Sequence, residues 1–289
     1  MIRTRTITPD LRESIGAIRS GCGHQSASHS FHSLFLWQKD LGLSVCLREN
    51  VFAVRCKYWK DNAWFFPCGE KEAVLGLVRE LIAEEPSLRF LYMREEDASL
   101  MKNHFPGRFR IVPADDASEY LYDRNEYVGM PGKKYEDIRW SINHLKSHHL
   151  LRTEPLTSAG LETAHQMLVG WTPRYQSEFF SRDHETTPLM LVHFDRIGIN
   201  GVIVYMDEKP AAIAAGFPLT ENTYDIAFSK AAVMERGLQF YTRREMIALL
   251  PGQYTVINGE EDLGIPGLRR AKLLENPVGK IEMFSAYEE

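Results

Sequence analysis

Residues 254–272 read Tyr-Thr-Val-Ile-Asn-Gly-Glu-Glu-Asp-Leu-Gly-Ile-Pro-Gly-Leu-Arg-Arg-Ala-Lys, and this stretch decides the fold of the second half of the chain. Its start has the composition of a β-strand, and Pro266 suits the first turn of a helix. Because Gly264 permits a tight entry into that helix, the N–H groups of Gly267 and Leu268 can hold an anion at its positive end. Alternatively, the acidic residues before the helix and the basic residues within it only complement the helix dipole.

Around this stretch, hydrophobic periodicity predicts the element order β-α-α-β-β-β-α-β-α-β for the second half, which is the order of an N-acyltransferase of the GNAT type. Helices are expected over 158–169, 184–197, 234–250 and 266–274, and strands over 151–155, 202–206, 211–217, 223–228, 254–257 and 280–284. The first half repeats this order at a spacing of about 145 residues and closes with a strand over 119–123.

The doubled order predicts an α/β protein with mixed sheets, made of two tandem GNAT-like acyltransferase domains. We expect an N-terminal domain over residues 1–130 and a C-terminal domain over residues 150–289, with a linking helix over 131–149. A chain of 289 residues is long enough for two hydrophobic cores.

Three blocks of sequence, which span most of the chain, carry a family resemblance. They are Asn258–Lys272 with Asn276-Pro277 beyond it, Tyr120–Asp123 with Pro131–Asn143, and the looser Phe31-x-x-Leu34-Phe-x-Trp37. The chain resembles a bacterial family related to the catalytic C-terminal domain of phosphatidylglycerol lysyltransferases. That family and the Fem-type aminoacyltransferases pair two GNAT-like domains, so the resemblance implies the same tandem fold.

The resemblance also implies a place for the chemistry, at the end of strand 254–257, where GNAT sheets splay and bind ligand. Transfer of an aminoacyl group requires a proton acceptor and stabilisation of an oxyanion. The candidate catalytic residues there are Asn258, Glu260 and Asp262, with Glu260 or Asp262 as the proton acceptor. Arg269 and Lys272, three residues apart on one helix, are expected to hold an anion. Alternatively, the acids and these cations form only ion pairs with each other.

The predicted helix over 133–149 carries further candidate substrate-binding residues. Its apolar stripe is expected to pack against a domain, with Arg139 and Asn143 along the edge of the stripe. Lys133 and Lys134 precede them in the most basic window of the chain. The alternative is a solvated face of a linking helix, which is the commoner role of such charges.

The donor loop of acyl-CoA-dependent GNAT enzymes is degenerate in this sequence. Close approach of backbone to a diphosphate requires several glycines, but residues 229–241 contain only Gly237, followed by bulky Leu238, Phe240 and Tyr241. Acyl-CoA is therefore disfavoured, and we expect no tightly bound cofactor. The resemblance implies an aminoacyl-tRNA donor, since the Fem-type and lysyltransferase families also lack this loop.

Composition excludes several other classes of protein. The formal charge of −5 gives no global field for nucleic acid, so specific DNA binding is not expected. No apolar run is long enough to span a membrane and no signal peptide is evident, which predicts a cytoplasmic protein. The four cysteines form no CxxC pair and are expected to be buried or idle thiols. The Cys22-x-His24-x4-His29-x2-His32 cluster matches no common zinc template, so no metal site is predicted.

The sequence thus predicts an acyltransferase that moves an aminoacyl or other acyl group to an amine or hydroxyl acceptor. Charged tRNA is the expected partner, and the acceptor is a small molecule, a peptide or a lipid. The competing hypothesis is a non-catalytic ligand-binding or regulatory protein that retains the acyltransferase fold, because fold does not fix function.

Overall fold

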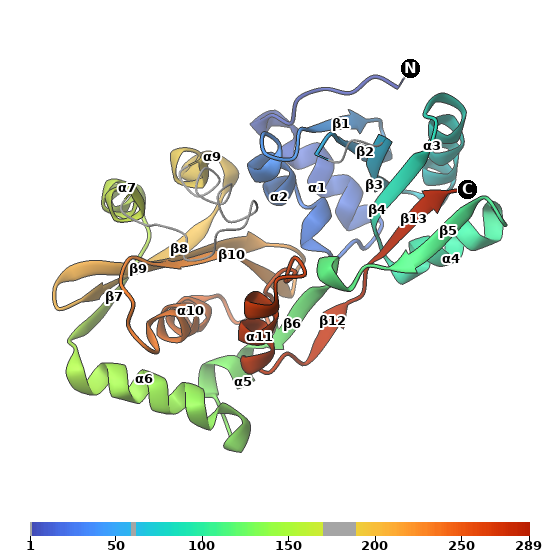
Figure 1. Ribbon diagram of the computed structural model, residues 1–289. Helices are drawn as coiled ribbons and strands as arrows, with labels where there is room; N and C mark the ends of the chain where they lie inside the picture. Colours follow the sequence, from blue (N-terminus) through green and yellow to red (C-terminus); the bar gives the residue numbers. More distant parts are fainter. Residues whose placement is uncertain (1, 59–61, 170–188) are drawn as a thin grey trace. The chain divides into compact units, whose positions relative to one another are not determined.

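The computed structural model describes residues 2–58, 62–169 and 189–289 (Figure 1). Two mixed β-sheets with helices on their faces make up the fold, as the element order predicted. The chain divides into two compact units: unit 1 comprises residues 1–119, 261–268 and 280–289, and unit 2 comprises residues 120–260 and 269–279. Among the described residues, no helix is both long enough and apolar enough to cross a membrane.

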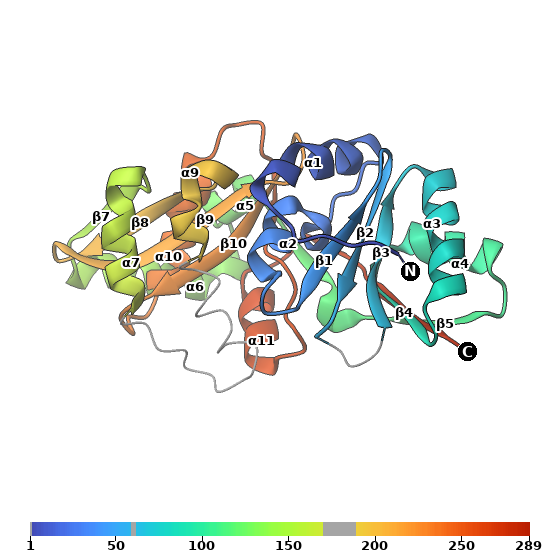
Figure 2. The same ribbon diagram turned by 90° about the horizontal axis from the view of Figure 1, so that it is seen from above.

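Unit 1 is built on a six-stranded sheet of order β1-β2-β3-β4-β13-β5. Its strands are β1 (Leu43–Leu47), β2 (Val51–Cys56), β3 (Asn62–Gly69), β4 (Leu88–Met93), β5 (Phe109–Pro113) and β13 (Phe284–Glu288). Helices α1 (Arg12–Gly21) and α2 (Phe31–Trp37) lie on one face, and α3 (Lys71–Glu84) and α4 (Glu95–His104) lie on the other (Figure 2). Fully buried Trp64, Phe66 and Phe90 fill the core.

Unit 2 is built on the seven-stranded sheet of order β12-β6-β11-β10-β9-β8-β7. The strands are β6 (Glu119–Asp123), β7 (Leu151–Pro155), β8 (Asn200–Met206), β9 (Lys209–Pro218), β10 (Thr223–Ala231), β11 (Val256–Asn258) and β12 (Gly279–Ile281). The helices are α5 (Arg124–Gly129), α6 (Glu136–His148), α7 (Leu161–Val169), α9 (Phe194–Ile197), α10 (Leu238–Leu249) and α11 (Pro266–Leu274). Helices α7 and α9 cover one face of this sheet, and α10 covers the other with α6 outside it (Figure 1).

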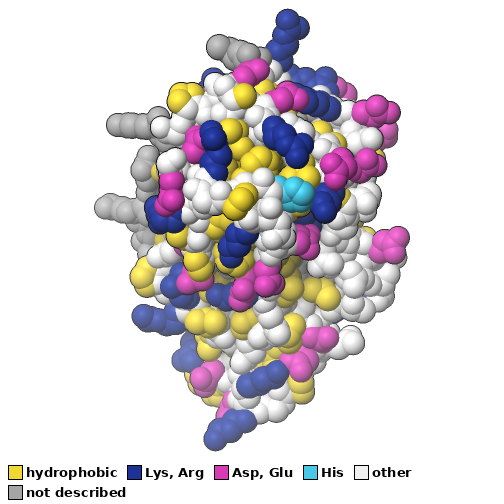
Figure 3. Space-filling model, turned by 90° about the vertical axis from the view of Figure 1, so that its right-hand side faces the viewer, with side chains coloured by type: hydrophobic (Ala, Val, Ile, Leu, Met, Phe, Trp, Pro, Cys, Tyr) yellow, Lys and Arg dark blue, Asp and Glu magenta, His cyan; other side chains and the backbone are white. Residues whose placement is uncertain are grey.

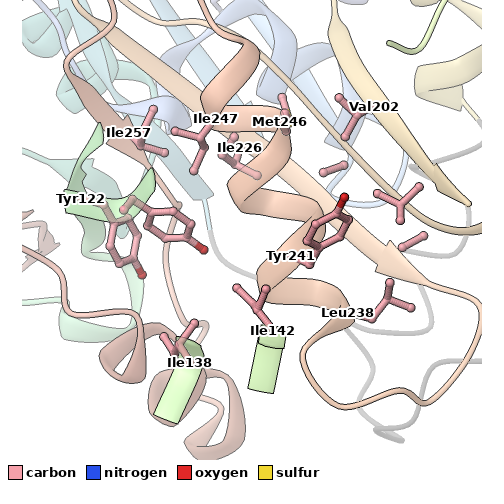
Figure 4. Packing of buried hydrophobic residues seen from close by; sticks show 14 of the residues in the cluster. Tyr122, Ile138, Ile142, Val202, Ile226, Leu238, Tyr241, Met246, Ile247 and Ile257 are labelled. Carbon is pink, nitrogen blue, oxygen red and sulfur yellow. The ribbon is translucent and has the colours of Figure 1, made fainter. Parts of the chain in front are cut away.

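The core of unit 2 explains why α6 is not a free linking helix. Its buried stripe, Ile138, Ile142 and Leu145, packs in the same cluster as Leu238 and Tyr241 of α10 (Figure 4). Burying such a stripe stabilises the helix far more than its intrinsic propensity does. Residues 131–149 therefore belong to unit 2, which differs from the predicted three-part division.

The two sheets also exchange strands relative to the predicted repeat. Strand β6, expected to close the N-terminal domain, pairs antiparallel with β11 in the second sheet. The strand expected over 280–284 is two strands, and β13 pairs between β4 and β5 in the first sheet. Helix α10 begins at Leu238 rather than at residue 234. Residues 184–188 of the helix expected over 184–197 lie outside the described residues.

Charge is distributed without a dominant sign on the face of the molecule that Figure 3 shows. Lysine and arginine side chains alternate there with aspartate and glutamate side chains, and apolar atoms lie between them. Mixed surface charge is consistent with the modest formal charge of −5 and creates no extended field of one sign on this face.

Candidate functional site at the ends of strands β10 and β11

A short parallel pairing between β10 and β11 brings two polar side chains together in unit 2. Thr223, Tyr224 and Asp225 lie opposite Val256, Ile257 and Asn258, and strand β11 ends there while β10 continues to Ala231. Residues directly opposite each other project to the same face of a sheet, so Asp225 and Asn258 are side-by-side neighbours. Both are completely buried.

The backbone of β10 is irregular at this point. Its register with β9 shifts between Asp225 and Phe228, which marks a β-bulge. Gly216 of β9 faces the irregularity, and a Cβ atom there would stand 1.8 Å from the carbonyl oxygen of Asp225. Only glycine allows this approach, so the sequence of β9 is adapted to the bulge beside Asp225.

Lys230 lies further along β10 and is 8% exposed. Burial lowers the pKa of its ammonium group to about 8, although the negative charge of Glu260 acts in the opposite direction. A lysine with such a pKa exchanges protons near neutral pH, which an exposed lysine does not do. The Lys230 ammonium group is therefore within electrostatic reach of the Glu260 carboxylate, which lies two residues beyond the end of β11.

The turn after β11 holds Glu260 in a defined conformation. Glu260 has φ +60°, and its backbone N–H donates a 2.7 Å hydrogen bond to Oδ1 of Asn258. This is an Asx turn, which tolerates the left-handed region by supplying a local acceptor. The side chain of Glu260 is half-buried, and the side chain of Asn258 is buried.

Gly259 is clamped between α11 and β6. Its N–H donates to the carbonyl of Tyr120 at 2.9 Å, and its carbonyl accepts from Nζ of Lys272. The Tyr122 hydroxyl donates to the carbonyl of Lys272 at 3.1 Å. A Cβ atom on Gly259 would lie 2.7 Å from the ring of Tyr122, so this position also requires glycine. The contacts fix the strand end that carries Asn258.

Behind Gly259, a buried ion pair joins α10 to the residue that follows α11. Nη1 of Arg243 lies 3.0 Å from Oε2 of Glu275, and its guanidinium group lies about 6 Å from the rings of Tyr122 and Tyr127. Burial raises the pKa of Glu275, while the Arg243 charge opposes that shift. The pair fixes α10 and the end of α11 around the turn.

Asp262, the other predicted proton acceptor, belongs to unit 1. It is completely buried, and its Oδ1 accepts a 2.9 Å hydrogen bond from the N–H of Gly264. Its carbonyl accepts from Ile265 at 2.9 Å. These bonds shape the loop that leads into α11, and Asp262 is thus more buried than Glu260.

The two predicted anion holders on α11 differ in environment. Lys272 is buried, binds the carbonyl of Gly259 and lies 5.9 Å from the ring centroid of Tyr120. Arg269 is exposed. Lys272 thus supports the turn, and Arg269 is presented to solvent.

The predicted substrate-binding residues near α6 also differ in environment: some bind other parts of the protein, and others are exposed. Nη1 of Arg139 donates to the carbonyls of Met130 and Gly132, which stabilises the positive φ angles of these two residues. Lys134 pairs with Glu126. Lys133 and Asn143 are exposed. Arg139 and Lys134 thus have structural partners, while the roles of exposed Lys133 and Asn143 stay a prediction.

The start of α10 is where a GNAT enzyme would bind the acyl-CoA pyrophosphate, and here it packs against α6. Gly237 has φ +90°, and a Cβ atom there would stand 2.4 Å from the carbonyl oxygen of Ser141. Nε of Arg236 donates to Oγ of Ser141 at 3.1 Å, and its guanidinium lies 4.3 Å from the ring centroid of Trp140. Leu238 is fully buried. This packing agrees with the degenerate donor loop of the sequence.

The histidines of the Cys22–His32 cluster are core residues of unit 1. The rings of His24 and His29 lie 4.4 Å apart, and Nε2 of His29 lies 2.9 Å from the carbonyl oxygen of Phe66. Burial lowers the pKa of His29 to about 3, so the ring is neutral. Within residues 2–58, 62–169 and 189–289, no three His, Cys, Asp or Glu side chains are grouped to hold a metal ion.

Sequence reasoning missed four residues of this site: buried Asp225, Lys230 and Glu275, and partly buried Arg243. One signal was present, since Asp225 and Lys230 are charged residues within a strand over 223–231 whose other residues are uncharged. A charged residue inside such a strand needs a partner or a function. Arg243 and Glu275, by contrast, look like ordinary surface charges of two helical segments.

Comparisons with known proteins agree with this description. The family model described as phosphatidylglycerol lysyltransferase, C-terminal, matches residues 20–287. A conserved protein of unknown function from Bacteroides thetaiotaomicron is similar in structure, with TM-score 0.91 and 24% identity over 100% of both chains. L-PGS from Bacillus licheniformis has TM-score 0.67 and 17% identity, over 98% of this chain and 93% of its own. Among curated proteins, none matches this chain in sequence.

FemX is a further structural neighbour, with TM-score 0.59 and 10% identity over 99% of this chain and 97% of its own. At these identities the structural matches establish the fold alone. They confirm the predicted fold class, and the family model confirms the predicted family.

Proposed function

We propose that this chain, which belongs to the phosphatidylglycerol lysyltransferase C-terminal family, transfers an aminoacyl or other acyl group to an amine or hydroxyl acceptor. The observation that carries the proposal is the position of Lys230 and Glu260 in unit 2. Glu260 lies two residues beyond the end of β11, which buried Asn258 and Asp225 mark, and Lys230 lies further along β10, where the charge of Glu260 acts on its pKa. A proton-exchanging pair on a rigid strand end suits acyl transfer better than passive binding.

In this proposal Glu260 is the proton acceptor. The acceptor's amine or hydroxyl loses its proton to the Glu260 carboxylate as it attacks the carbonyl carbon of the donor ester. The charge that develops on the carbonyl oxygen is stabilised by the ammonium form of Lys230. When the tetrahedral intermediate collapses, the proton passes to the departing alcohol oxygen of the donor.

Asn258 and Asp262 have positioning roles in this scheme. Asn258 orients the backbone of Glu260 through its side-chain hydrogen bond, and Asp262 shapes the loop before α11. Lys272 holds Gly259 in place. An error of about 1 Å in the placement of the acceptor is enough to lose most of a rate enhancement, so these contacts matter for catalysis without touching substrate.

The proposed donor is an aminoacyl-tRNA rather than an acyl-CoA. Packing of Gly237 against Ser141 leaves little room for backbone N–H groups to meet a diphosphate at the start of α10. Exposed Lys133, Asn143 and Arg269, all in unit 2, are the proposed contacts for donor phosphates. The proposed acceptor is a small molecule, a peptide or a lipid headgroup.

Incubating the protein with a mixture of charged tRNAs and candidate acceptors, and with a panel of acyl-CoAs in parallel, tests the proposal by mass spectrometry of the products. We expect aminoacylated product from the tRNA reaction and a loss of about 100- to 10,000-fold in rate for Glu260→Gln. Glu221→Gln, an exposed change in the same unit, is the matched control. Turnover of acyl-CoA alone would refute the proposed donor, and tRNA binding without product would favour the non-catalytic hypothesis.

A further inference from the structure

Two cysteines of unit 1 that are far apart in sequence meet in the fold. Cys22 directly follows α1, and Cys68 lies near the end of β3. Their sulfur atoms are 3.5 Å apart, and both residues are free thiols. Cys22 is partly exposed, whereas Cys68 is 1% exposed.

We propose that Cys22 and Cys68 form an oxidation site, at which hydrogen peroxide converts the two thiols into a reversible disulfide. The thiolate of Cys22 attacks one peroxide oxygen, so that an S–O bond forms, the O–O bond breaks, and the leaving hydroxide takes up a proton to become water. The sulfur of Cys68 then attacks the Cys22 sulfenic acid. The S–S bond forms, the S–O bond breaks, and the proton of Cys68 leaves with the hydroxide as water.

The surroundings of the two sulfurs assign these unequal roles. The hydrogen bond with Cys68 is the main cause that lowers the pKa of Cys22 to about 6, and the charges of Arg94 and Arg19 act in the same direction. The pKa of Cys68 is raised by the same bond and by burial. Buried His24 and His29 add no further positive charge, since burial lowers the pKa of each and keeps both rings neutral. The accessible sulfur is thus the nucleophile, and the buried one resolves it.

The surroundings of the other two cysteines differ from those of Cys22 and Cys68. Cys46 is buried, and burial raises the pKa of its thiol. Cys56 is buried, and its Sγ lies 3.4 Å from the carbonyl oxygen of Leu41. The sequence predicted buried or idle thiols; Cys46, Cys56 and Cys68 are buried, and the present proposal gives a role to Cys22 and Cys68.

Treatment of the folded full-length chain with hydrogen peroxide at pH 7, followed by alkylation in denaturant and peptide mapping, tests the proposal. We expect a cross-linked peptide that contains Cys22 and Cys68, a mass lower by two hydrogen atoms, and full reversal by dithiothreitol. Cys68→Ser should abolish the cross-link and leave a Cys22 sulfenic acid that dimedone traps. The control variant Cys46→Ser should still form the cross-link between Cys22 and Cys68. Stable alkylation of all four cysteines after peroxide, or cross-links to Cys46 or Cys56 instead, would overturn the proposal.

Discussion

Asp225 lies directly opposite Asn258 in the parallel pairing of β10 and β11, and both side chains are completely buried. Strand pairing alone places this carboxyl group and this amide on one face of the sheet, at the point where β11 ends. Lys230 follows Asp225 later in β10, and Glu260 follows Asn258 in the turn after β11. The position of Glu260 thus depends on where the three-residue strand β11 ends.

Replacing Lys230 by methionine should flatten the pH dependence of stability between about pH 8 and pH 10.5. The pKa of Lys230 is about 8 in the folded protein and 10.5 as its ordinary value. In this window the unfolded chain binds more protons than the folded one, so the free energy of unfolding of the wild type rises with pH. The lowered pKa corresponds to a rise of about 3 kcal/mol.

Urea unfolding of the wild type and of Lys230→Met at several pH values measures this difference. Lys209→Met, an exposed change at the start of β9, should retain the wild-type rise. A rise of equal size in Lys230→Met would show that another group titrates in this range.

Gly259→Ala should destabilise the protein by about 1–3 kcal/mol, because the new Cβ would lie 2.7 Å from the buried ring of Tyr122. The turn that carries Glu260 must move to relieve this contact, so transferase activity should fall as well. Gly252→Ala is the matched control, since a Cβ atom added at Gly252 would meet nothing within 4 Å. Thermal melting of both variants makes the comparison, and equal melting temperatures would contradict the proposed clamp.

Removing only one partner of the Arg243–Glu275 pair should be costly. Glu275→Leu leaves the guanidinium group buried without its carboxylate, which typically costs about 3–5 kcal/mol. The double variant Arg243→Met/Glu275→Leu should lose much less than the sum of the single changes. Denaturant unfolding of all three variants gives the coupling energy. Additive losses would indicate that the two charges do not depend on each other.

Arg269→Ala should weaken binding of charged tRNA by about 10- to 100-fold, if its guanidinium group contacts a phosphate. The free energy of unfolding should change by no more than about 1 kcal/mol, as for exposed charges in general. Arg270→Ala, an exposed neighbour on the same helix, is the control. Filter binding measures the tRNA affinity of both variants, and melting curves measure their stability. Equal affinity of the two variants would remove Arg269 from the site.

Local structure was largely predictable from local sequence. Helix α11 and strands β6 and β7 have the bounds that periodicity indicated. Strand partners were not predictable in the same way. The alternation of side chains along Glu119–Asp123 predicts a strand but not that β6 pairs with β11, because strand pairing depends on contacts distant in sequence.

The candidate site shows the same limit. Residues 258–262 are recognisable as polar residues after a strand; Asn258 lies opposite Asp225, and the charge of Glu260 acts on the pKa of Lys230. Burial separates Glu260 from Asp262, and Arg269 from Lys272, although their spacing suggested equal roles. Sequence spacing describes the helix or loop, whereas burial depends on the elements that pack against it.

The exchange of β6 and β13 between the two halves of the chain has a consequence for biosynthesis. The first sheet lacks β13 until the ribosome has made the chain through Glu288. During translation of unit 2, β4 and β5 therefore have no β13 between them to pair with. An open strand edge of this kind invites pairing with other nascent chains. We expect expression of residues 1–130 alone to yield aggregates rather than a folded half, and dependence on chaperones that shield the gap until the last strand arrives.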